Sequence, residues 1–177
     1  MRFLWVALAW LLAGCLPVAV LRSPEPVAGR SLALGLSAVG VWGQGALLVP
    51  YAAYAQGDGS TEYSFSVQLG LRAGLKQALF PGVSLDLGLT LPPFVGQEGL
   101  PLAADAGLLL GLGGFYFSPR VHWLGFAYQE LNISGFIYQA TLGYAGEGFL
   151  GEVGVLFNPR GGGQGAALFS LSAAVRL

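Results

Sequence analysis

Few side chains in this sequence could carry out chemistry, and they do not cluster. The chain of 177 residues contains one histidine, His122, one cysteine, Cys15, eight Lys or Arg and nine Asp or Glu. A metal site needs several ligands, and no partner motif accompanies His122. No serine stands beside His122 for it to activate as a nucleophile. We therefore predict no catalytic residue, no metal, no cofactor and no enzymatic activity.

The overall charge and hydrophobicity argue against a nucleic-acid-binding protein and against a typical soluble domain. The formal net charge is −1, and no basic stripe is present to neutralise phosphates, so nucleic acid is not an expected partner. Hydrophobic residues make up 54% of the chain and charged residues 10%, and the mean hydropathy is +0.64. A typical soluble domain has roughly 25% charged residues. This chain therefore lacks the charge that a water-facing surface normally carries.

The stretch 62–74 shows the pattern on which the fold prediction depends. Apolar side chains occupy one face of an extended chain, and small or polar side chains occupy the other, because successive strand residues point to opposite faces. The apolar face carries Tyr63, Phe65, Val67, Leu69 and Leu71. The same alternation recurs along the chain, and it predicts eight strands, at 31–41, 62–74, 83–91, 104–116, 121–128, 136–144, 149–157 and 167–177.

Two stretches do not fit this pattern. Residues 44–56 are apolar without clean alternation and contain Pro50, so we interpret them as a long loop, a short extra strand or a lid. Residues 75–82 form a long connection that ends in Pro81-Gly82. The strand count, eight against ten, stays open at this point. A membrane helix over 32–55 fits poorly because of its glycines, its proline and its two-residue period.

The charged residues within the predicted strands indicate which face points inward. Five such residues, Arg72, Asp86, Asp105, Glu152 and Arg176, all lie on the polar phase of their strands. That phase is otherwise rich in Gly, Ser, Thr and Gln, which suit a narrow interior. We predict that these five charges line a polar interior and that the apolar faces point outward.

With strands of about ten residues, an apolar outside, a polar inside and aromatic residues near the strand ends, the chain resembles the small transmembrane β-barrels of the bacterial outer membrane, such as the outer-membrane protein A and X type. The resemblance implies an all-β, membrane-embedded, up-and-down antiparallel barrel. It places the short connections 118–120 and 145–148 on the periplasmic side and the longer 92–101, 129–134 and 158–165 outside. Some such barrels are lipid-modifying enzymes, but His122 lacks the accompanying residues.

The N-terminus combines Arg2, an apolar run and the residues Leu12, Ala13, Gly14 and Cys15. This resembles the lipobox of bacterial lipoproteins, in which the chain is cut before the cysteine and the cysteine carries acyl chains. The resemblance implies a signal peptide at 1–14, a lipidated Cys15 followed by a proline-containing tether to residue 29, and a barrel at 30–177. It also implies export to the outer membrane of a Gram-negative-type envelope.

The predicted function is that of a lipid-anchored outer-membrane barrel with a polar, plugged interior and a structural role or a surface-interaction role. Outer-membrane lipid is the expected partner, an extracellular partner could bind the loops, and the protein is expected to be a monomer. Two alternatives stay open. One is a narrow pore for small solutes, and the other is a periplasmic, lipocalin-like barrel that binds an apolar ligand in its interior.

Overall fold

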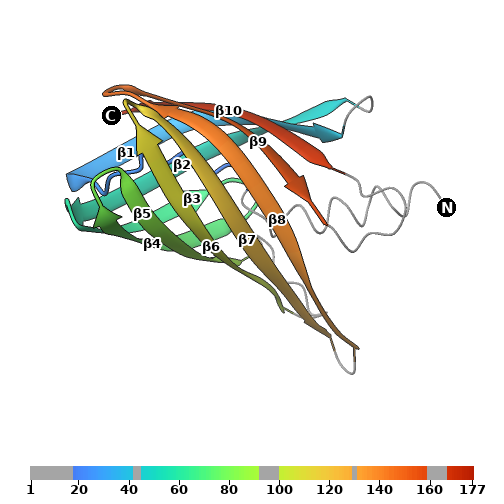
Figure 1. Cartoon of the computed structure of the whole chain (residues 1–177). Coiled ribbons are helices and arrows are strands. Elements are labelled where there is room, and N and C mark those ends of the chain that lie inside the picture. Colours follow the sequence, from blue (N-terminus) through green and yellow to red (C-terminus); the bar gives the residue numbers. More distant parts are fainter. Residues whose placement is uncertain (1–17, 42–44, 92–99, 129–130, 159–166) are drawn as a thin grey trace.

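The chain forms a closed, antiparallel, up-and-down β-barrel (Figure 1). The computed structural model describes residues 18–41, 45–91, 100–128, 131–158 and 167–177. Within them, ten strands pair in sequence order, and β1 pairs with β10 to close the barrel. The strands are β1 (Ala28–Val41), β2 (Ala46–Asp58), β3 (Thr61–Val67), β4 (Leu71–Phe80), β5 (Val83–Leu91), β6 (Leu100–Leu112), β7 (Phe115–Tyr128), β8 (Leu131–Ala145), β9 (Phe149–Phe157) and β10 (Leu168–Arg176).

The two ends of the barrel differ in their connections. One end, called the turn end here, has the tight connections 59–60, 81–82, 113–114 and 146–148 and also holds the C-terminus. The other end, called the loop end, has the connections 42–45, 68–70, 92–99, 129–130 and 158–167. At the turn end, Gly113 and Gly114 have φ of 59° and 86°, as a two-residue hairpin turn requires of its central residues.

The barrel architecture confirms the all-β, up-and-down prediction, but the expected count of eight strands was wrong. Residues 44–56 were interpreted as a loop because Pro50 interrupts them, yet they belong largely to β2. Proline is tolerated there because the β2–β3 ladder begins only at Ala52↔Val67, so β2 pairs on one side alone at Pro50. This accounts for one of the two missed strands.

The second missed strand comes from the stretch 62–74, which was predicted to be a single strand. It is divided by a turn at 68–70, where the Gln68 amide donates to the Gly70 carbonyl oxygen, 3.1 Å away. The predicted connection 75–82 is therefore mostly β4, and only Pro81 and Gly82 form its turn. The alternation continues through 68–70 without a polar cluster, so the pattern gave no sign of this turn.

The predicted turn at 118–120 and loop at 129–134 were also wrong. Pro119 lies within β7, and the β6–β7 pairing is interrupted between Gly107↔Arg120 and Leu110↔Phe117, around this residue. Proline has no N–H to donate, so it weakens a ladder locally without ending the strand. β8 already begins at Leu131, so little of the predicted loop is left between the strands.

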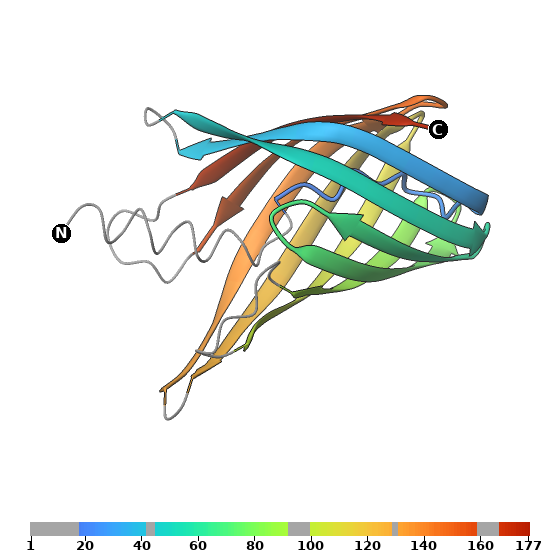
Figure 2. The ribbon, with the colours of Figure 1, turned by 180° about the vertical axis from the view of Figure 1, so that it is seen from behind.

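Residues 18–27 lie inside the barrel and are called the inner segment (Figure 2). Val18 is 1% exposed, and it packs on Val39 and Leu156, near the loop-end termini of β1 and β9. At the other limit, the Val27 carbonyl oxygen accepts from the Gly59 amide at the turn end. The predicted tether to residue 29 was therefore wrong over this segment, and β1 begins at Ala28.

The outer wall is apolar. Large hydrophobic side chains from all ten strands are exposed on it, for example Leu48 (68%), Leu89 (53%) and Leu171 (66%). The inward phase contains small, polar and charged residues, together with the apolar side chains that contact the inner segment. A lipocalin-like barrel would place its apolar face inside, and the structure places that face outside.

Candidate functional site: the filled lumen

The barrel wall supplies hydrogen-bond partners for the backbone of the inner segment, which pairs with no strand. At the loop end, Gln68 Oε1 accepts from the amides of Val18 (3.0 Å) and Ala19 (3.3 Å), and Gln139 Nε2 donates to the Val18 carbonyl (3.0 Å). In the middle, the Tyr51 hydroxyl donates to the Val20 carbonyl at 2.9 Å. A buried backbone needs such partners, so the wall fixes the course of this segment.

Carboxylates and a lysine hold the rest of that backbone. Glu152 Oε2 accepts from the Leu21 amide at 2.9 Å, and its Oε1 accepts from the Val20 amide at 3.4 Å. Lys76 Nζ donates to the carbonyl oxygens of Ser23 and Glu25 at 3.0 and 3.1 Å. Close to the turn end, Ser84 Oγ donates to the Pro24 carbonyl, and Glu62 Oε2 accepts from the Val27 amide.

Seven charged side chains form one connected group, called the lumen ion network: Arg22, Glu62, Arg72, Lys76, Asp86, Asp105 and Arg120. Asp86 lies at its centre. Asp86 Oδ2 contacts Arg72 Nη2 at 3.1 Å and Arg120 Nη2 at 2.5 Å, and Asp86 Oδ1 is 3.8 Å from Arg22 Nη1. Arg72 and Arg120 also share Asp105, which Arg72 contacts at 2.7 and 2.9 Å.

Arg22 is the member of this network that the inner segment contributes. Its Nη1 donates to Glu62 Oε1 at 2.7 Å, and its Nη2 donates to Ser64. In the described chain, the barrel wall contributes three buried cations (Arg72, Lys76 and Arg120) and four buried carboxylates (Glu62, Asp86, Asp105 and Glu152). Glu152 accepts from backbone amides and contacts no cation among the described residues, so the three wall carboxylates of the network already match its three wall cations. Arg22 adds a fourth cation, which Glu62 and Asp86 pair.

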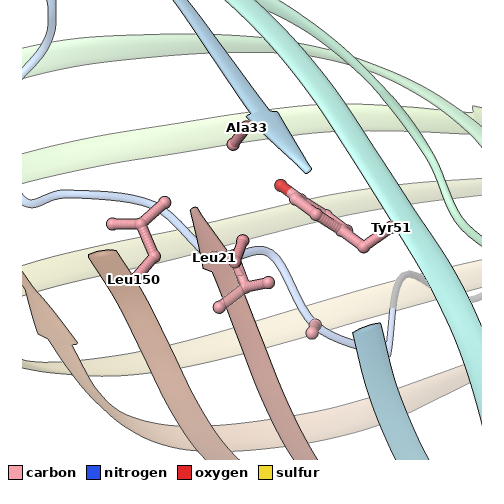
Figure 3. Packing of buried hydrophobic residues seen from close by; sticks show 6 residues of the cluster. Leu21, Ala33, Tyr51 and Leu150 are labelled. Atoms are coloured by element: carbon pink, nitrogen blue, oxygen red, sulfur yellow. The ribbon is translucent and has the colours of Figure 1, made fainter. Parts of the chain in front are cut away.

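The other side of the lumen packs on apolar atoms of the inner segment. Leu21 lies among Ala33, Tyr51, Leu150 and Ala174, from β1, β2, β9 and β10 (Figure 3). Leu21 is 3% exposed, and Ala19 joins the same cluster. The inner segment therefore presents Arg22 to one side of the lumen and Leu21 to the other.

His122 is fully buried, and Gln139 connects it by hydrogen bonds to the inner segment. Its Nε2 lies 2.8 Å from Gln139 Oε1, while Gln139 Nε2 donates to Val18. An amide oxygen only accepts, so this contact requires the proton to be on Nε2. The predicted turn at 118–120 would put His122 at the start of a strand, but the residue lies within β7, in register with Asp105 and Ile137.

Glycines in the wall make room for the arginines. A Cβ added at Gly107 would lie 3.0 Å from the Arg120 guanidinium, and one at Gly74 would lie 2.6 Å from Arg72 Nη1 and 2.8 Å from Arg22 Nη2. A Cβ at Gly88 would meet both the Arg72 guanidinium and Asp105. The glycines within the strands therefore provide the space that the ion network occupies.

The structure brings together three of the five charges that the sequence singled out. In the network, Arg72 contacts both Asp86 and Asp105. Glu152 lies in the lumen but contacts the inner segment and the Tyr116 hydroxyl (2.9 Å) rather than a cation. Arg176 is half-buried at the turn end, where it lines a cavity of about 410 Å³ with Ser23, Glu25 and Glu147. Cys15 lies outside the described residues.

Sequence reasoning missed four members of the network: Arg22, Glu62, Lys76 and Arg120. Glu62 has the phase of Ser64 and Ser66, Lys76 has that of Arg72, and Arg120 has that of His122. Glu62 already lay in the predicted strand 62–74, and extending the alternation through the supposed connections 75–82 and 118–120 would have found Lys76 and Arg120. Arg22 carries no such signal, because the inner segment belongs to no strand.

Two other features are absent from the described residues. These residues contain no group of three or more His, Cys, Asp or Glu that could hold a metal ion. They also contain no helix that is long and apolar enough to cross a membrane.

The comparisons with known proteins give only distant structural likenesses. No family model matches the chain, and no curated protein matches it.

Its structural neighbours are outer-membrane β-barrels. They include the attachment invasion locus protein Ail of Yersinia pestis, at 12% identity and a TM-score of 0.30, covering 88% of this chain and 100% of that one. The N-terminal β-barrel domain of Pseudomonas aeruginosa OprF has 14% identity, a TM-score of 0.35 and coverages of 84% and 98%. Neisserial surface protein A has 12% identity, a TM-score of 0.32 and coverages of 84% and 94%. TM-scores this low do not carry function from one protein to another.

Proposed function

We propose that this protein is a lipid-anchored β-barrel of the bacterial outer membrane whose lumen is closed by its own N-terminal segment. Its role in this proposal is structural, or one of surface interaction through the loop end. It is not a channel or an enzyme, and His122 serves to hold the inner segment. The supporting observations are the distribution of charge, the aromatic residues on the outer wall and the filled lumen.

The distribution of charge carries the proposal. Every charged residue in the described chain lies either in the lumen or at the turn end, where Glu25, Arg30, Asp58, Glu147 and Arg176 are found. The outer wall between the two ends has only uncharged side chains in the described chain, and large apolar ones dominate it. A surface of this kind is unfavourable in water and favourable in hydrocarbon.

Aromatic side chains border this apolar belt at both ends. Phe115 and Tyr144 contact each other edge to face at the turn end, with ring centroids 5.1 Å apart. Tyr138 and Phe157 stack nearer the loop end, at 5.9 Å. On β9, the outward residues Phe149 and Phe157 are eight residues apart, or about 27 Å along a strand, and roughly 20 Å in height at the usual tilt of about 40°. This height is close to the apolar band of outer-membrane barrels, about 25 Å.

The filled lumen favours a closed barrel over a pore. The inner segment crosses the interior with its backbone bonded to side chains of the wall, and Leu21 and Arg22 occupy opposite sides of it. A ten-stranded barrel without such a segment would have an interior wider than its own side chains fill. A continuous water path through the barrel would therefore require the inner segment to leave.

The experiment combines fractionation, lipid labelling and conductance. Cells expressing the wild type or Cys15→Ser are grown with labelled palmitate, and the outer membrane is separated. We expect label on the wild-type protein only, and a folded band of both variants that shifts in mobility on boiling. The purified wild type should give no single-channel steps in planar bilayers. Steady conductance of the wild type would show that it is a pore, and a water-soluble, unlabelled protein would contradict the whole proposal.

A further inference from the structure

The direction in which the inner segment runs through the barrel determines on which side of the membrane the chain before Val18 lies. The segment enters at the loop end, where Val18 is bound by Gln68 of the β3–β4 turn and belongs to a cluster against which Leu69 of the same turn packs. It reaches the turn end at Val27, next to Gly59. β1 then returns toward the loop end (Figure 2). The chain thus crosses the barrel once inside the lumen before it forms the wall.

We propose that the N-terminal lipid anchor lies on the loop side of the membrane, in the outer leaflet, and not on the periplasmic side. This inference rests on the proposed function, because it uses the lipidation of Cys15 and the orientation of a barrel whose longer loops face outward. A lipoprotein anchor followed by a simple tether would lie on the periplasmic side. The threaded inner segment reverses that arrangement.

The length of the chain makes the assignment a strict one. Cys15 precedes Val18 by three residues, and three fully extended residues span at most about 11 Å. The apolar band of such a barrel is about 25 Å tall. A cysteine joined to Val18 at the loop end therefore cannot reach the leaflet at the turn end. The ten residues that could have bridged this distance are already used inside the lumen.

At the loop end, the inner segment is bonded to the turn that follows β3, the shortest of the described strands. β3 is seven residues long, and six residues of β2, from Ala46 to Tyr51, extend beyond its end without a partner on that side. The Gln68 side chain links this turn to the Val18 and Ala19 amides and donates to Ser37 Oγ at 2.6 Å. Gln68 thus fixes the start of the described inner segment at the loop end.

The contacts along the segment oppose the reverse direction. Arg22 has to face Glu62 and Asp86, Leu21 has to face Leu150 and Ala174, and the amides of Val20 and Leu21 have to reach Glu152. A chain that ran from the turn end to the loop end would present its donors and acceptors in the opposite order. The wall therefore specifies the direction of the segment as well as its position.

The test is the accessibility of epitope tags in intact cells. One tag is inserted after Pro17, a second within 159–166 at the loop end, and a third after Leu177 at the turn end. Each variant is checked for palmitate label and for heat-modifiable mobility, so that only folded, lipidated protein is scored. We expect antibody to bind the first two tags on intact cells and the third only after permeabilisation.

Two other results are distinguishable from each other. If the loop tag is bound on intact cells while the tags after Pro17 and Leu177 are both protected, the anchor is periplasmic and the inference is wrong, although the proposed outer-membrane barrel stands. If the loop tag is protected and the Leu177 tag is exposed, or if no variant fractionates with the outer membrane, the proposed function itself fails and the inference fails with it.

Discussion

The two sides of the lumen hold the same inner segment by different means. The side formed by β3–β7 is charged, and it binds the Arg22 side chain through Glu62 and Asp86. The side formed by β8–β10, β1 and β2 is mostly small or apolar, with Glu152 as its one fully buried charge in the described chain. That charge faces backbone amides, not a cation.

This difference shows how a segment outside any strand is specified. The neutral side fits the shape of the segment through Leu21 and satisfies its amides, and those interactions accept many sequences of similar size. The charged side favours a cation at one position, because both Glu62 and Asp86 face Arg22 there. Packing thus mainly sets the position of the inner segment in the lumen. The charged contacts set which of its residues faces Glu62 and Asp86. The following substitutions test that division.

The largest effect is expected at the centre of the charged side. Asp86→Asn removes the carboxylate that three arginines share and leaves Arg22, Arg72 and Arg120 with too few partners. We expect a loss of about 3–5 kcal/mol in the free energy of unfolding, as for other broken buried pairs. Denaturant titration in lipid vesicles measures it, with Glu147→Gln at the exposed turn end as the control. Equal, small losses in the two variants would show that the network contributes little.

Leu21→Ala tests the neutral side. The side chain is buried against Ala33, Tyr51 and Leu150, so its truncation leaves a cavity inside the lumen. We expect a loss of about 2–3 kcal/mol in the free energy of unfolding, in the lower part of the usual range because small residues form much of the surroundings. The same truncation at Leu48, which is 68% exposed on the outer wall, should cost under about 1 kcal/mol. A Leu21 variant as stable as the wild type would mean that the segment is not packed there.

Gly88→Ala tests the space available on the charged side. The added methyl group would meet the Arg72 guanidinium and Asp105, which have little freedom to move. We expect destabilisation by about 1–3 kcal/mol, which is typical of overpacking. Gly135→Ala is the matched control, because a Cβ at Gly135 has no atom within 4 Å. If both glycines tolerate alanine equally in the thermal unfolding of the purified proteins, the ion network is looser than described.

The smallest effect is expected for Ser172→Ala, on the neutral side. The Ser172 hydroxyl is buried and has no hydrogen-bond partner within the described part of the chain. Its removal leaves no other group unpaired, so we expect a change within about 0.5 kcal/mol, in either direction. Thermal unfolding of this variant beside Asp86→Asn gives the contrast between the two sides. A loss as large as that of Asp86→Asn would remove the distinction between them.

The sequence predicted the class of fold because a period of two assigns each residue to one face. Arg72, Asp86, Asp105 and Glu152 share the polar phase, and the structure places all four in the lumen. The strand count failed for a local reason. Pro50 lies within a strand, beside a short neighbouring strand, which goes against the usual signals for strands. The turn built from Gln68, Leu69 and Gly70 goes against the usual signals for turns.

The inner segment could not have been predicted from its own residues. Val18 to Val27 contains three prolines or serines and one arginine, a composition that fits an exposed tether equally well. What distinguishes it is long-range: Arg22 meets a residue 40 positions away, and the Leu21 amide meets one 131 positions away.

Hydrogen exchange of individual amides tests most directly whether the N-terminal segment fills the lumen. The protein in lipid or detergent is transferred to D2O, and exchange is followed by NMR. The amides of Val18, Val20 and Leu21 belong to no strand ladder, yet side chains of the wall accept from them. We predict that they exchange as slowly as the amides in the middle of β1. Exchange of all three at the rate of an exposed, extended chain would contradict a filled lumen.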